Sequence, residues 1–400
     1  MERIRERLRK LKQDKHSEES LPPPPPPILP DERPRPLTAA PCAPAVTANS
    51  VFFQRVPPEI RRRILVEAFG ARTLHLDLRL EHPLRKGGRS SRSVVASRPQ
   101  RHANAQLFHP SLRDATRPRE WTWWSCVCHH ADPSIGFDVL PPGIGFRAPE
   151  PALDACRDPL SWPPPGGMCE YYPGPMPGKC FIGVLPWLLT CRAAYVEGID
   201  VLYATNRFHM EYAALVVNLP RLLTPSRLAA IRQVELTWSL AISSSGPDSH
   251  WASGVDGLEG GDDRLAMLSY LPKILPNLRY LYLSLRDIQP TREWKYAYGG
   301  QDMYDATEEV LHSIDTMVVR LTGLRDCRVA LPTRFYATRK QLDKAGEIAR
   351  NRWSGPEPDV LWRSIDFTDA YTEGAANDQL LCGYWIVHGY EDMQQPVDVL

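Results

Sequence analysis

The sequence predicts an α/β fold (α/β or α+β) on the basis of three observations. An amphipathic helical pattern at residues 57–69 is followed by alternating apolar residues at 74–80, which is the pattern of a strand. A second helical pattern with a broad apolar stripe begins at Pro186. In the C-terminal half, helical and strand patterns alternate at a nearly constant spacing. Such alternation is typical of helices packed on a sheet.

The first 50 residues are predicted to form a disordered arm that is basic and rich in proline. The 400-residue chain contains 40 prolines, and six of them stand in succession at residues 22–27. Proline lacks a backbone donor and has a fixed φ, so this run favours polyproline II and joins no core. Two alternatives are a docking peptide for an aromatic-lined groove and a nuclear-import patch at the basic residues 7–12.

Residues 51–80 are predicted to form one helix and one strand. Pro57 and Pro58 suit the start of a helix, and Gly70 suits its end. The apolar side chains that share one face of this helix are Ile60, Ile64, Leu65 and Ala68. In the strand that follows, leucines alternate with polar residues from Leu74 to Leu80.

Residues 81–180 are predicted to be an irregular insertion that is partly disordered. Residues 81–119 show no periodicity and are rich in Arg, Ser and Pro. Residues 120–180 are rich in Trp, Pro, Gly and Cys. For this second stretch we expect irregular chain that lies against the core, with Trp121, Trp123 and Trp124 as anchors.

The last predicted domain, residues 181–400, begins with a helix over residues 186–206. Its apolar stripe consists of Leu188, Leu189, Tyr195, Val196, Ile199, Leu202 and Tyr203. Asn206 suits the turn after this helix, and residues 208–212 favour a strand. The domain closes with acidic, aromatic chain in which residues 384–388 favour another strand.

Three segments of this domain resemble one another: IRQVELTW (231–238), LRYLYLSL (278–285) and LRDCRVAL (324–331). Each begins with an apolar residue and an arginine, and their starts lie 47 and 46 residues apart. Helical patterns at 264–274 and 305–321 precede the later two. Units of this kind are similar to leucine-rich repeats, which stack into an extended surface. A plain α/β sheet with coincidental spacing is the alternative.

Composition and charge bear on the partners and the compartment. Lys and Arg number 48 and Asp and Glu 47, so no global field attracts nucleic acid or a membrane. Residues 71–125 hold eleven basic and four acidic side chains, whereas residues 351–400 hold two and nine. We expect these segments to face each other or to stay solvated, with polyanion binding by the first as the alternative.

No run of apolar residues approaches the 18 needed to span a bilayer, so we expect no membrane partner. The nine cysteines are odd in number and scattered, and the charged first residues lack a secretory pattern. These features predict a reducing compartment, the cytoplasm or the nucleus.

The segment CVCHH contains the best metal-site candidate in the sequence. The candidate ligands are Cys126, Cys128 and His129, joined by Cys169 and Cys180. Thiolate and imidazole suit tetrahedral zinc, but these spacings differ from the paired ligands of the usual structural sites. Buried free cysteines are therefore the preferred interpretation, structural zinc is the alternative, and no cofactor is predicted.

No motif predicts catalysis. The sequence contains neither a G-x-S-x-G elbow nor an H-E-x-x-H pair. Cys169 follows two glycines, but no helical pattern after it would lower its pKa. The Gly-rich segment 257–263 is acidic and lacks the lysine of a phosphate-binding loop. We therefore predict that the protein is not an enzyme.

Two segments carry a family resemblance. FFQRVPPEIRRRILVEAFG resembles the opening helix of F-box proteins, with Val56 in place of their leucine and with matches that include Pro57, Ile60 and Ile64. LLTCRAAYVEGIDVLYATNRFHM (188–210) is similar to the second part of this module in a fungal family of F-box-like proteins of unknown function. The matching positions there are Leu188, Leu189, Cys191, Arg192, Tyr195, Leu202, Tyr203, Asn206 and Phe208.

The resemblance implies a protein-interaction role. F-box helices dock on a small adaptor of cullin ubiquitin ligases, while C-terminal repeats hold a substrate. The docking residues would be Val56, Pro57, Ile60 and Ile64, and the alternative is that these side chains are core. The implied architecture is a set of F-box-like helices packed on a short leucine-rich-repeat-like helix–strand stack.

The predicted function is thus that of a non-catalytic interaction protein, specifically a substrate adaptor for a cullin ligase. One alternative is a structural or regulatory scaffold without a ubiquitin link. The other is a metal- or cysteine-dependent enzyme that uses the Cys/His segment 126–180.

Overall fold

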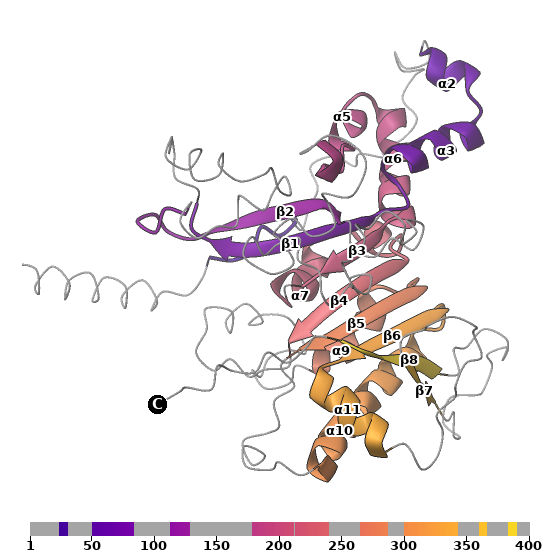
Figure 1. Cartoon of the computed structure of the whole chain (residues 1–400). Helices are drawn as coiled ribbons and strands as arrows, with labels where there is room; N and C mark the ends of the chain where they lie inside the picture. The colour runs from indigo at the N-terminus through magenta and orange to yellow at the C-terminus, as the bar shows by residue number, and fades with distance from the viewer. Residues whose placement is uncertain are drawn as a thin grey trace, which may run out of the picture.

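A computed structural model describes residues 24–30, 50–83, 113–128, 178–211, 213–239, 265–286, 300–342, 360–365 and 383–389. These residues form a mixed α/β structure around a central sheet (Figure 1). The basic patch at 7–12, His129, Cys169 and the Gly-rich segment 257–263 lie outside the described residues. No helix in the described ranges is both long and apolar enough to cross a membrane.

The sheet has eight strands in the order β2-β1-β3-β4-β5-β6-β8-β7. The strands are β1 Thr73–Glu81, β2 Glu120–Cys128, β3 Arg207–Met210, β4 Gln233–Ser239, β5 Tyr280–Arg286, β6 Asp326–Leu331, β7 Val360–Ser364 and β8 Gly383–His388. The six inner strands run parallel, while β2 and β7 pair antiparallel with their neighbours at the two edges. The predicted α/β class is confirmed.

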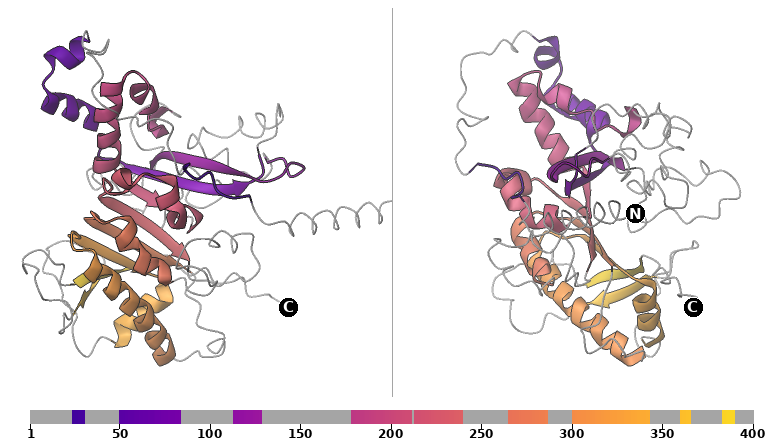
Figure 2. Two further views of the ribbon diagram at one scale, coloured as in Figure 1. Left: turned by 180° about the vertical axis from the view of Figure 1, so that it is seen from behind. Right: turned by 90° about the vertical axis from the view of Figure 1, so that its left-hand side faces the viewer.

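Most of the helices in the described ranges fall into two groups. The helices are α2 Val51–Arg55, α3 Pro58–Phe69, α5 Leu185–Leu188, α6 Arg192–Thr205, α7 Ala213–Leu222, α8 Pro225–Leu228, α9 Ala266–Ile274, α10 Gly300–Arg320 and α11 Thr333–Leu342, with a 3-10 turn, η7, at Gly178–Cys180. Helices α7, α9 and α10 cover one face of the sheet (Figure 2). Helices α2, α3, α5 and α6 gather where β1 and β3 begin, and we call them the helical unit (Figure 1).

The core lies between the sheet and α7, α9 and α10. Each inner strand points one row of apolar side chains toward these helices, as strand alternation requires. Val234, Leu281 and Cys327, for example, lie in register on β4, β5 and β6 and are all buried. Their neighbours from the helices include Leu219 and Leu271, which belong to the same cluster.

The three similar segments of the sequence occupy equivalent positions in the sheet. Gln233 pairs with Tyr280, and Tyr280 pairs with Asp326, so the three segments start at the same level. The arginines in their second positions follow one another: Arg279 N donates to Arg232 O, and Arg325 N donates to Arg279 O, both at 2.8 Å. The positive charge of Arg232, with smaller effects of burial and Arg325, lowers the pKa of Arg279.

The helix predicted over residues 186–206 is in fact two helices, α5 and α6. The helix is interrupted at Leu189–Cys191, where Thr190 Oγ1 donates to Trp187 O at 2.7 Å. The Cys191 side chain then accepts from Ala194 N at 3.3 Å and so caps the new helix. Local side-chain hydrogen bonds of this kind compete with continuation of a helix.

Residues 120–180 were expected to be irregular, but Glu120–Cys128 forms strand β2. All nine of its residues pair with β1, from Glu81 opposite Glu120 to Thr73 opposite Cys128. Of the expected anchors, Trp124 is buried, Trp121 is half-buried and Trp123 is exposed at 45%. The aromatic and β-branched residues of this stretch suit a strand, and β1 supplies the pairing edge.

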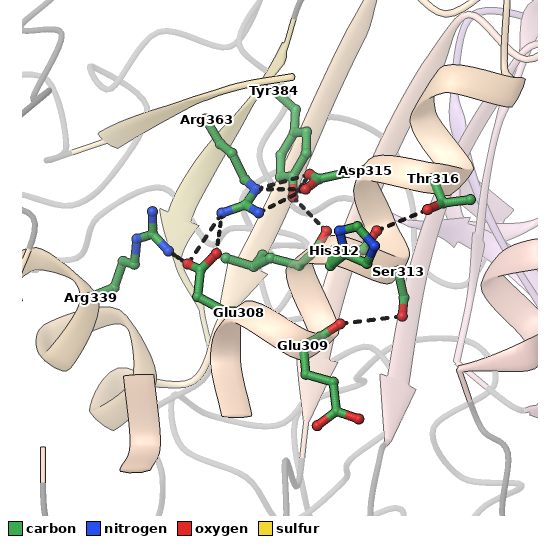
Figure 3. Close-up of polar contacts among 10 residues, drawn as sticks. Glu308, Glu309, His312, Ser313, Asp315, Thr316, Arg339, Arg363 and Tyr384 are labelled. Atoms are coloured by element: carbon green, nitrogen blue, oxygen red, sulfur yellow. Dashed lines mark hydrogen bonds and ion pairs between the residues drawn. The ribbon is translucent and has the colours of Figure 1, made fainter. Parts of the chain in front are cut away.

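The C-terminal strands β7 and β8 are attached to the helices by an ionic network (Figure 3). Arg363 on β7 donates to Asp315 on α10 at 2.7 Å and to Glu308 at 2.9 Å. Glu308 also pairs with Arg339 on α11. Tyr384 on β8, a fully buried side chain, donates to Asp315 Oδ1 at 2.9 Å. The network joins two helices to two strands that come from separate parts of the sequence.

Part of the proline-rich arm lies against the folded body. Trp121 Nε1 donates to Pro24 O at 2.7 Å, and Leu29 N donates to the carbonyl of Arg221 on α7, also at 2.7 Å. A proline run keeps its carbonyls free to accept hydrogen bonds. Residues 24–30 of the predicted arm therefore contact both β2 and α7.

Candidate protein-docking site

Helix α3 has one face on α6 and another in solvent. Leu65 and Phe69 are buried and cluster with Val184 and Val201. Ile60 and Ile64, one turn apart, are instead exposed at 50% and 44%. Side chains four residues apart share one helix face, so these two isoleucines form an exposed apolar ridge.

Arg61 fixes the orientation of this ridge. Its Nε and Nη2 donate to Glu197 on α6 at 3.0 and 2.6 Å, which is a bidentate pair. Its Nη1 donates to the carbonyl of Val56 at 2.6 Å and thereby holds the bend between α2 and α3. The hydrogen bond to Glu197 raises the pKa of Arg61. A second pair, Arg62 with Asp200, joins the same two helices at 2.7 Å on the surface.

Helix α2 is held by aromatic contacts. The rings of Phe52 and Phe53 lie 5.3 and 6.2 Å from the ring of Trp187 on α5. Trp187 in turn packs against Gly198 on α6, where a Cβ atom would lie only 2.6 Å from Trp187 Cδ1. The helical unit is therefore tied together from α2 to α6, although α2 contains no buried residue.

Asn206 joins the two segments that lead from the helical unit into the sheet, one from α3 to β1 and the other from α6 to β3. Its Nδ2 donates to Phe69 O at 3.0 Å and to Leu202 O at 2.9 Å. Its Oδ1 accepts from Arg72 N at 2.9 Å. One buried side chain thus links the end of α3, the end of α6 and the start of β1.

Of the four predicted docking residues, three are exposed: Pro57, Ile60 and Ile64. Val56 is half-buried at the bend between α2 and α3. The alternative assignment of Ile60 and Ile64 to the core does not hold in this structure.

Sequence periodicity missed further exposed apolar residues on the helical unit. Leu189 and Val196, both members of the predicted apolar stripe, are exposed at 75% and 45%. Val51 and Leu185 are exposed as well. Helical spacing tells which side chains share a face, but not which neighbouring element covers that face.

The predicted metal ligands are only partly described. Cys126 and Cys128 are buried on β2, and Cys180 is buried in η7. Their partners in the prediction, His129 and Cys169, lie in the parts left undescribed. Structural zinc on this set stays a prediction.

The geometry defines an α/β protein in which a group of short helices, with exposed apolar side chains, is joined to one end of a largely parallel sheet. A protein-family model described as Domain of unknown function (DUF7730) matches residues 176–350, from η7 to beyond α11. This similarity agrees with the expected kinship to a family of unknown function. Neither the curated proteins nor the solved structures gave a match.

Proposed function

We propose that this protein is a non-catalytic interaction protein whose α2–α3 segment docks on another protein. The leading candidate for that partner is the small adaptor of cullin ubiquitin ligases. In this proposal the helix–strand stack holds the substrate, as a leucine-rich-type array would, and the protein acts in the cytoplasm or the nucleus.

The observation that carries the proposal is the exposed ridge of Ile60 and Ile64 on a helix that is otherwise fixed. Arg61 and Leu65, next to the ridge, hold α3 on α6. A helix that is ordered before binding loses little conformational entropy when a partner covers it. Burying the exposed half of each isoleucine against a partner contributes about 1 kcal/mol to the free energy of binding. The two isoleucines together then contribute about 2 kcal/mol.

The proposal is tested by measuring the affinity of the purified cullin-ligase adaptor for the full chain. The variant is Ile60→Asp combined with Ile64→Asp. We expect binding to weaken by at least about 30-fold, because 1.4 kcal/mol corresponds to a factor of ten. The melting temperature should change little, since both side chains are already exposed.

Phe181→Asp is the matched control, because Phe181 is equally exposed but lies outside the four helices. It should leave adaptor binding unchanged. If the unmodified chain binds no adaptor, the ubiquitin link is wrong. A scaffold role then becomes the better account, with partners identified by co-purification. If the Ile60/Ile64 variant unfolds, the two side chains are needed for folding and the docking proposal fails.

A further inference from the structure

The face of the sheet opposite α7, α9 and α10 carries a buried polar cluster. His75 on β1, His209 on β3 and Glu235 on β4 are neighbours in one row of the register. All three have no exposed surface, and the same is true of Asp77. Glu211 directly follows β3 and is largely buried. Burying ionisable side chains is costly unless they are paired, hydrogen-bonded or bound to a metal.

The distances within the cluster are short. His209 Nδ1 lies 3.1 Å from Glu235 Oε2, and His209 Nε2 lies 3.4 Å from Glu211 Oε1. The ring centroids of His75 and His209 are 4.5 Å apart. One donor atom from each of His75, His209 and Glu211 falls within 4.8 Å of the other two. Two imidazoles and one carboxylate therefore converge on one point.

The separation of two of these donor atoms, on His209 and Glu211, is the one that a bound zinc ion requires, and the third donor, on His75, lies within 4.8 Å of both. Zinc takes imidazole and carboxylate ligands at about 2.0–2.1 Å in tetrahedral geometry, which places the ligand atoms about 3.3 Å apart. The 3.4 Å between His209 Nε2 and Glu211 Oε1 fits that separation. Two histidines and a carboxylate are a donor set typical of borderline divalent metals.

The neighbours of these residues suit the same role. A histidine that binds a metal through one ring nitrogen normally donates its other N–H to a carboxylate, and Glu235 is placed to accept it from His209 Nδ1. Glu235 is itself held by Arg207 at 3.1 Å. Asp77 Oδ1 accepts the backbone N–H of Glu211 at 3.4 Å, which positions that residue.

We propose that His75, His209 and Glu211 bind a divalent first-row transition-metal ion, with zinc as the expected ion and Glu235 as the orienting carboxylate. The ion links β1 to β3, whose ligands stand 134 residues apart in the sequence at His75 and His209. The site shares no residue with the predicted Cys/His set, and it does not depend on the docking proposal.

The test uses the full chain, stripped of metal by a chelator and titrated with Zn²⁺ and with Co²⁺. We expect one equivalent of either ion to bind and the Co²⁺ complex to lack a thiolate charge-transfer band. Glu211→Gln should abolish binding. Glu235→Gln should weaken it by about 10- to 100-fold, the usual effect of losing an orienting carboxylate.

Glu309→Gln and His312→Asn are the matched controls, since both residues are exposed on α10. Both should leave binding unchanged. If Glu211→Gln does not fold, Glu235→Gln decides the matter by its affinity. Three outcomes overturn the proposal: no bound ion, a thiolate band in the Co²⁺ complex, or an affinity that survives both cluster variants. If no ion binds, the cluster is a purely ionic network.

Discussion

Asn206 shows how much a single side chain can connect. Its amide joins three backbone groups, from Phe69, Arg72 and Leu202, and none of its surface is exposed. The sequence indicated only that Asn206 suits a turn. Its partner Phe69 lies 137 residues away along the chain, so no local pattern could have revealed the contact.

At the residue scale, we predict that Asn206→Ala destabilises the protein by about 2–4 kcal/mol, because it leaves buried backbone groups without a partner. Urea unfolding monitored by circular dichroism measures the change. Asn277→Ala is the control: Asn277 is exposed and makes one bond, to Ala229 O at 2.8 Å. Loss of this hydrogen bond should lower the free energy of unfolding by less than about 1 kcal/mol. Equal effects of the two substitutions would contradict the role of Asn206.

The candidate sites were predictable to different degrees. Ile60 and Ile64 could be named from sequence because helical spacing and the F-box resemblance both point to them. The metal cluster could not, because His75, Asp77 and Glu235 appear in the sequence as ordinary polar residues of alternating strands. Only the sheet register brings His75 beside His209, and pairing between distant strands leaves no local sequence signal.

At the element scale, the contact of α5 with α6 depends on a glycine. A Cβ at Gly198 would meet Trp187 at 2.6 Å and Leu188 at 3.0 Å. Alanine normally favours a helix over glycine by about 1 kcal/mol, but here overpacking should outweigh that gain. We predict that Gly198→Ala destabilises the protein by about 1–2 kcal/mol, measured by thermal unfolding.

Gly178→Ala provides the comparison, because no atom lies within 4 Å of the Cβ position at Gly178. That substitution should be close to neutral. A stabilising effect of Gly198→Ala would show that Trp187 moves aside without cost.

The elements that were predicted correctly have strong periodicity of their own. The helix expected at 305–321 is α10, and the strand expected at 384–388 is β8. Strand β2 was missed because Trp-rich chain beside Pro- and Gly-rich segments gives no clear alternation. The break at Leu189–Cys191 was missed because an apolar stripe runs through it, and the two helices are separated by local hydrogen bonds of the Thr190 and Cys191 side chains.

At the scale of the whole molecule, three side chains with raised pKa values, Tyr280, Tyr384 and Cys327, should make the fold less stable at alkaline pH. Burial raises the pKa of Tyr280 to about 12. Burial, and to a lesser extent the charge of Asp315, raises that of Tyr384 well above 10. Burial also raises the pKa of the Cys327 thiol above its usual range. The folded state therefore keeps these protons at pH values where the unfolded chain releases them.

Because the folded-state pKa values are raised, the stabilisation is complete below about pH 9 and declines as the pH rises toward 12. Each group lowers the free energy of unfolding by at most about 1.4 kcal/mol per pH unit. Urea midpoints measured from pH 8 to 11 test this. Cys327→Ala should flatten the slope between pH 9 and 11. A stability that does not change up to pH 11 would contradict the prediction.

The order of the inner strands has a consequence for how such a protein could evolve. Strands β3 to β6 sit beside their predecessors in chain order, and helices α7, α9 and α10 return over the same face. Because each of these strands pairs only with its two neighbours, gain or loss of one helix-plus-strand unit would change the pairing only at that point of the sheet. Such a change would widen or narrow the sheet, while the helices where β1 and β3 begin remain the same.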